Sequence, residues 1–165
     1  MWSSDRFTRR AVVVGSVSAL ACCGFEPVYA PSGTGAALRG QVAVQTPANS
    51  NGFIIRQRLE DQFGAADNAR FNLSVRVTTT ERRVAVTRNQ ATRRFNILGN
   101  ATYVFTDTRT GRQRTGEVET FTSYAATGTT VATAAAERDG YRRLMVDLAD
   151  RLIDQLYASV PGTAG

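Results

Sequence analysis

The sequence contains no histidine and no lysine, and its only two cysteines, Cys22 and Cys23, are neighbours. Histidine is the commonest general base and the commonest metal ligand in proteins. Its absence excludes a Cys–His nucleophile and the usual kind of zinc site. A disulfide between adjacent cysteines would close a strained ring outside the preferred bridge geometry. We therefore expect no catalytic residue, no metal, no cofactor and no internal disulfide.

The sequence also lacks an apolar run long enough to cross a membrane. Residues 11–21 carry no charge and follow three arginines, at positions 6, 9 and 10. A bilayer-spanning helix needs roughly 20 apolar residues, so this stretch is too short. A cationic start, a short apolar core and a small-residue exit are typical of a secretory signal. We expect residues 1–22 to be a signal peptide, and the Arg9-Arg10 pair leaves open either the general or the twin-arginine export route.

The end of the leader carries a cysteine motif. Leu20-Ala21-Cys22-Cys23 resembles the bacterial lipobox, in which a leucine and two small residues precede the acylated cysteine. The resemblance implies cleavage after Cys22 and lipid attachment at Cys23. Cys22 departs from the usual Gly or Ala, and it could itself be the acylated residue, although Leu20 would then lie one position too close. Two or more acyl chains would anchor the protein stably to a leaflet.

The remaining chain divides into a tether, one domain and a tail. Residues 23–40 include a stretch rich in Gly, Pro and Ser, which predicts a flexible tether. Residues 41–158 are long enough for one domain with its own core. Residues 159–165 are expected to form a loose tail.

Within the domain, hydrophobic periodicity predicts six elements. A short strand over residues 41–46 precedes a helix over 52–63, in which Ile55, Leu59 and Phe63 share a face. Three alternating strands follow, joined by turns near residues 88–91 and 107–111, and an amphipathic helix over 131–157 ends the domain. Two amphipathic helices need one sheet face to cover. We therefore predict an α+β fold, a two-layer sandwich with a mixed four-stranded sheet covered by two helices, in the order β-α-β-β-β-α.

The residues after the lipobox suggest a family. Cys23-Gly24-Phe25-Glu26-Pro27-Val28-Tyr29 resembles the mature start of the LptE (RlpB) family of lipopolysaccharide-assembly lipoproteins, and the resemblance continues weakly through residues 101–107, 123–124 and 148–152. It implies a lipoprotein on the periplasmic side of the outer membrane, anchored there through its N-terminal lipid. The implied partners are an LptD-type β-barrel, which the family plugs, and lipopolysaccharide. Gly24 rather than Asp after the acylated residue fits outer-membrane sorting.

Five arginines surround the first hairpin turn, at positions 82, 83, 88, 93 and 94. Arginine binds phosphate through its planar fork, and lipid A carries phosphates, so Arg88, Arg93 and Arg94 are candidate lipopolysaccharide-binding residues. The alternative is a solvated sheet edge protected by charge. Arg93 and Arg94 are adjacent on a strand and should point to opposite faces. Arg109, Arg112 and Arg114 mark the next turn, at the opposite end of the meander.

The sequence leaves other functions to weigh. A net charge of +6 could indicate nucleic-acid binding, but the export signal and the aromatic residues on predicted buried faces argue against a nucleic-acid partner. Glu117 and Glu119 share one strand face and could serve a carboxylate hydrolase, although such pairs are more often surface charge. Another lipid-anchored accessory of a lipid transporter is the closer alternative. We expect a non-catalytic assembly lipoprotein rather than an enzyme.

Overall fold

The structure is a computed structural model that describes residues 34–66, 68–86, 92–127 and 129–159. Leader, lipobox and tail therefore lie outside the described residues. In chain order the elements are α2 (Thr34–Leu38), β1 (Val42–Gln45), α3 (Ser50–Phe63), β2 (Phe71–Val86), β3 (Thr92–Asp107), β4 (Gln113–Thr127) and α4 (Thr130–Ser159).

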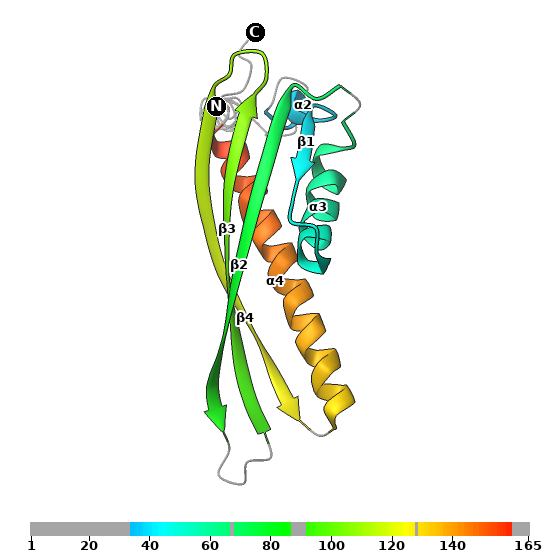
Figure 1. Ribbon diagram of the computed structural model, residues 1–165, viewed down its shortest axis with the longest axis vertical. Helices are drawn as coiled ribbons and strands as arrows, with labels where there is room; N and C mark the ends of the chain where they lie inside the picture. The colour runs from blue at the N-terminus through cyan, green and yellow to red at the C-terminus, as the bar shows by residue number, and fades with distance from the viewer. Residues whose placement is uncertain (1–33, 67, 87–91, 128, 160–165) are drawn as a thin grey trace, which may run out of the picture.

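The strands form one mixed sheet in the order β1-β2-β3-β4. β1 lies parallel to the start of β2, and β2, β3 and β4 form an antiparallel meander. Both long helices lie on the same side of the sheet, with α4 running along most of its length (Figure 1). The predicted α+β fold and the order of its six elements are confirmed.

The core lies between the sheet and the two long helices. Ile55, Leu59 and Phe63 of α3 are fully buried, as the spacing of four predicted. On α4 the buried side chains include Leu144, Met145, Leu148, Leu152 and Leu156, at helical spacing, while Tyr141 is only half-buried. The strands contribute alternating residues, among them the buried Leu73, Ile97, Ala101, Tyr103 and Phe105. The apolar faces that follow from the period of two in the strands and the period near 3.6 in the helices thus pack together in a single core.

The ends of α3 follow from its flanking residues. The side chain of Asn49 accepts a hydrogen bond from the Gly52 N–H at 2.8 Å, which caps the first turn. Gly52 itself packs on the backbone of Pro47 so closely that a Cβ there would collide with the Pro47 carbonyl. Gly64 ends the helix with a φ of 78°, in the left-handed region that glycine favours.

The short helix α2 lies in the segment that composition predicted to be a flexible tether. Leu38 at its end is fully buried in the same core as the other helices. The Gly40 N–H donates to the Phe63 carbonyl at 2.6 Å, which ties the segment to the end of α3. One buried leucine and this tertiary hydrogen bond order residues 34–40, so the ordered domain begins earlier than the composition indicated.

The sheet has four strands only where β2 begins, because β1 is short. β1 pairs with β2 only from Phe71 to Ser74, and β2 continues beyond it to Val86. A bulge between Arg83 and Ala85 leaves Val84 without a partner on β3, and its side chain is 57% exposed.

Candidate functional site

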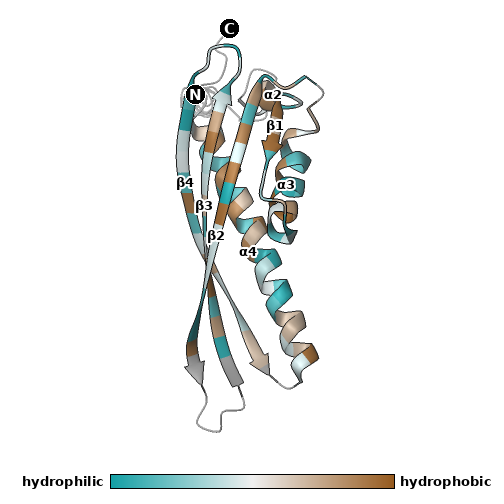
Figure 2. Cartoon of the chain, viewed as in Figure 1, coloured by the Kyte–Doolittle hydropathy of each residue, from teal (hydrophilic) through white to brown (hydrophobic). Residues whose placement is uncertain are grey.

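The sheet face opposite the helices is open and mostly polar, with many hydroxyl groups. Cross-strand register places side chains there from three strands: Ser74, Arg76, Thr78, Thr80 and Arg82 of β2; Asn96, Leu98, Asn100, Thr102 and Val104 of β3; and Thr115, Glu117, Glu119, Phe121 and Ser123 of β4. In Figure 2 hydrophobic and hydrophilic residues alternate along parts of these strands, as expected where one sheet face packs on a core and the other is exposed. We call this surface the open face.

Besides Val104, two large apolar side chains that face each other interrupt the open face. Leu98 and Phe121 are direct partners in the β3–β4 ladder, and they are 40% and 69% exposed. Directly opposite residues on one sheet face interact through their side chains. They line a shallow depression of about 370 Å³ together with Thr78, Thr80, Arg82, Asn100 and Glu119. The open face thus has an apolar centre with an arginine at its edge.

Sequence reasoning missed this apolar pair. The alternation of the strands could have revealed it. Leu98 points to the opposite face from the buried Ile97 and Ala101, and Phe121 points to the opposite face from the buried Tyr124. A large apolar residue at a solvent-facing position of a strand can indicate an interaction surface.

The arginine cluster divides between the two faces. Arg82 lies opposite Asn96 on the open face. The exposed Arg94 lies two residues along β3 from Asn96, so it is a diagonal neighbour of Arg82 on that face. Arg83 is on the helix-covered face, where its guanidinium lies 5.7 Å from the ring centre of Phe95. Among the predicted phosphate-binding residues whose side chains the structure describes, Arg94 therefore lies on the open face, near Arg82.

The other two predicted arginines are less well defined. Arg88 lies outside the described residues. Arg93 pairs with Val86 through its backbone, and its side chain lies outside what the structure describes. The candidate site that can be built from described side chains is therefore Arg82, Arg94, Leu98 and Phe121.

Glu117 and Glu119 share the open face, as their spacing predicted. The Asn100 amide donates to both carboxylates, at 2.9 Å in the case of Glu119. In a glycosidase, the two catalytic carboxyl groups lie on either side of the scissile bond, about 5–10 Å apart. Here one amide gathers both groups on a single exposed strand, which favours the surface-charge interpretation.

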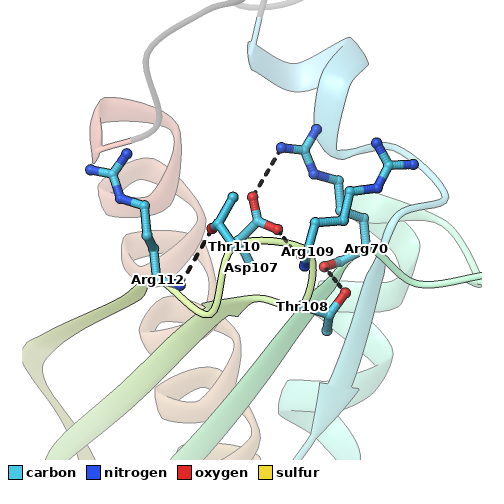
Figure 3. A network of polar contacts seen from close by, with 6 residues as sticks. All are labelled: Arg70, Asp107, Thr108, Arg109, Thr110 and Arg112. Atoms are coloured by element: carbon cyan, nitrogen blue, oxygen red, sulfur yellow. Dashed lines mark hydrogen bonds and ion pairs between the residues drawn. The ribbon is translucent and has the colours of Figure 1, made fainter.

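A second basic group occupies the opposite end of the sheet, as the meander predicted. The Asp107 carboxylate pairs with the Arg70 guanidinium at 2.9 Å and accepts the Arg109 backbone N–H at 2.9 Å (Figure 3). The hydrogen bond from Arg70 holds the pKa of Asp107 below its usual range, with the Arg109 N–H acting in the same direction. Thr108 donates through its hydroxyl to the Arg70 carbonyl at 2.8 Å. These contacts make a rigid turn, which we call the basic turn, residues 107–112.

Within the described ranges, no group of three His, Cys, Asp or Glu side chains is placed to hold a metal ion. No helix in the described part of the chain is long and apolar enough to span a bilayer.

Comparison with known proteins places this fold and sequence. Residues 40–156 match the family model "LptE: Lipopolysaccharide-assembly". A comparison with curated protein sequences gives no match.

The solved structures that share the fold include the following three proteins. A protein from Caulobacter crescentus CB15 is 19% identical, with a TM-score of 0.60 over 74% of this chain and 92% of that one. Rare lipoprotein B from Shewanella oneidensis is 10% identical, with a TM-score of 0.57 over 72% and 95% of the two chains. A minor lipoprotein from Acinetobacter baumannii is 16% identical, with a TM-score of 0.50 over 76% and 97%. At these identities the structural likeness concerns the fold alone.

Proposed function

The chain belongs to the LptE lipopolysaccharide-assembly family, and from that premise we propose that it is an outer-membrane lipoprotein that plugs an LptD-type β-barrel. In this role it assists the barrel in assembling lipopolysaccharide into the outer leaflet and catalyses no reaction itself. The family match carries the proposal, because it spans the sheet and both long helices rather than a local motif.

The shape of the domain supports a plug. β2 and β3 have 16 residues each, a length of about 50 Å at roughly 3.3 Å per residue. The hydrocarbon core of a bilayer is about 30 Å thick, so a domain of this length can fill a barrel lumen from one mouth to the other. Such lumens are lined with polar side chains, and the hydroxyl-rich open face offers them hydrogen-bonding partners.

The open face also supports recognition of an amphiphile. Lipopolysaccharide combines phosphates with acyl chains, and its recognition needs cations beside an apolar surface. Arg82 and Arg94 supply guanidinium groups, and Leu98 and Phe121 supply exposed apolar area next to Arg82. Guanidinium forks bind phosphate through paired hydrogen bonds. We assign phosphate contact to the two arginines and acyl contact to the apolar pair.

Isolation of the tagged chain from outer membranes tests the proposal. We expect a large β-barrel protein to co-purify in near-equal amount, and the N-terminal peptide to carry acyl chains on Cys23. An unrelated lipoprotein with the same tag is the control for adventitious capture. Recovery of the chain without a barrel, from membranes that contain one, would contradict the plug.

A further inference from the structure

The basic turn lies at the end of the domain from which the lipid tether would emerge. α2 and the turn between β3 and β4 occupy the same end of the long axis, whereas the β2–β3 hairpin and the start of α4 occupy the other (Figure 1). Residues 23–33 separate the predicted acylated cysteine from α2. Eleven residues span at most about 40 Å when fully extended. The end with the basic turn is therefore the end held near the leaflet.

The turn presents guanidinium groups that its own carboxylate does not neutralise. Asp107 is paired with Arg70, and no ion pair links Arg109 or Arg112 to any described carboxylate. Both side chains are exposed. Figure 3 shows Arg109 and Arg112 extending from the two flanks of the turn, away from the sheet. This end therefore carries two free cations that can meet an anionic surface.

The turn is also held in one conformation. The Gly111 N–H donates to the Asp107 carbonyl at 2.8 Å, and the Arg112 N–H donates to the Thr110 hydroxyl at 3.3 Å. Gly111 has a φ of 69°, which the turn requires and which glycine adopts without strain. A pre-organised turn loses little conformational entropy when its arginines bind.

We propose that, before the domain enters a barrel, Arg109 and Arg112 dock on the headgroup phosphates of the leaflet that holds the lipid anchor, so that the long domain stands upright with the end of β2 and the start of β3 directed away from that leaflet. The inference rests on the proposed acylation of Cys23. A short tether keeps the turn at a high effective concentration near the headgroups. Two weak contacts are then enough to hold the turn on the membrane surface. An arginine near an anionic membrane surface favours the bound state about fivefold, so two favour it roughly twenty- to thirtyfold.

Vesicle reconstitution of the acylated full chain tests this docking. The acylated cysteine leaves the mature protein without a free thiol, so a single new cysteine can carry a fluorophore. Ala36→Cys labels the tethered end and Ala132→Cys labels the far end, and both positions are exposed. The vesicles contain phosphatidylethanolamine and the anionic lipid phosphatidylglycerol, with a trace of a headgroup-linked quencher. Vesicles of phosphatidylcholine, which has no net charge, are the control.

We expect strong quenching at position 36 and little at position 132 in the anionic vesicles. The Arg109→Gln/Arg112→Gln double variant should show weaker quenching at position 36, and so should the native chain in 1 M salt, where the screening length falls to about 3 Å. Arg138→Gln/Arg142→Gln removes the same charge from exposed positions on α4, away from the basic turn, and should leave the pattern unchanged.

Equal quenching at position 36 in the native chain and the Arg109→Gln/Arg112→Gln variant would overturn the docking. A difference that appears only when an acidic protein partner is added would overturn it as well, since the turn would then bind protein rather than lipid. If Cys23 is not acylated, the chain will not enter the vesicles at all, which is a failure of the proposed function and is distinguishable from failure of docking.

Discussion

The Tyr103 side chain lies over Gly116, its partner across the β3–β4 ladder, and a Cβ at position 116 would be 2.5 Å from the phenol oxygen. Tyr103 is 4% exposed, and burial raises the pKa of its hydroxyl. The glycine therefore provides space for a buried aromatic ring, and the ring covers a strand position that has no side chain of its own.

Gly116→Ala is expected to destabilise the domain by about 1–3 kcal/mol, the usual cost of adding a methyl group to a filled site. In an open strand the same change would stabilise by up to about 1 kcal/mol, because alanine loses less backbone entropy on folding. The sign of the change in unfolding free energy, measured by urea denaturation, distinguishes the two cases. Thr115→Ala on the open face is the control and should change stability by less than about 0.5 kcal/mol.

Leu148→Ala is expected to cost about 2–5 kcal/mol, because it opens a cavity in the centre of the core. Leu148 is fully buried, and its Cδ1 would lie 2.9 Å from a Cβ at Gly99, which shows how closely α4 approaches β3. Val131→Ala truncates a residue of the same helix that is 77% exposed. Thermal unfolding should separate the two variants clearly, and equal losses would contradict the assigned packing.

The sequence predicted the elements whose burial repeats regularly. Leu148 belongs to an α4 stripe with a period near 3.6, and Phe105 belongs to a β3 alternation with a period of two, so both faces followed from spacing alone. The mixed sheet followed as well, because two apolar helix stripes required one sheet face to cover. Spacing does not reveal the close approach at Gly140, which is buried in α4, where a Cβ would lie 3.3 Å from Ile97.

Features that depend on tertiary contacts could not be predicted this way. α2 has five residues, too few to reveal a period, and it is ordered by the burial of Leu38 against distant elements. The bulge at Val84 depends on the register with β3, which no local pattern specifies. The pairing of Leu98 with Phe121 joins residues more than 20 positions apart, so the apolar centre of the open face becomes visible only once the register is known.

Asp107→Asn should lower the melting temperature at pH 6 and have progressively less effect below about pH 4. Arg70 lowers the pKa of the Asp107 carboxyl in the folded state. A depressed pKa stabilises the fold above the unfolded-state value of about 3.9, and this stabilisation is lost as the pH falls through the folded-state value. Melting curves of both proteins from pH 6 to pH 2 provide the test, with Asp61→Asn as an exposed-carboxylate control. A constant difference across that range would contradict the pairing.

Cys23→Ala is expected to release the domain into the soluble periplasmic fraction, because no acyl chain would then hold it on a leaflet. Cys22→Ala should leave the chain membrane-bound, since position 22 would be removed with the leader. Fractionation of cells expressing each variant, in a strain without the barrel partner, measures both outcomes. The reverse pattern would make Cys22 the acylated residue, and retention of both variants would argue against the anchor.

Arg82→Glu/Arg94→Glu is expected to weaken lipopolysaccharide binding at least tenfold without changing the melting temperature by more than a few degrees. Both arginines are exposed, so charge reversal leaves the core intact. Hydrogen bonds between charged groups contribute about 1.5–3 kcal/mol each, so losing one phosphate contact already accounts for a tenfold effect. Binding of purified lipopolysaccharide at matched ionic strength is the measurement.

Arg83→Glu is the matched control, because it reverses the neighbouring charge on the helix-covered face, where the Arg83 guanidinium lies over Phe95. If binding depends on the open face, Arg83→Glu should weaken it by less than about threefold, the screened effect of a charge that does not touch the ligand. Lipopolysaccharide stripped of its phosphates should bind the native chain and the Arg82→Glu/Arg94→Glu variant equally. Equal weakening by Arg83→Glu and by the double variant would instead assign the effect to net charge, and the open face would lose its role in recognition.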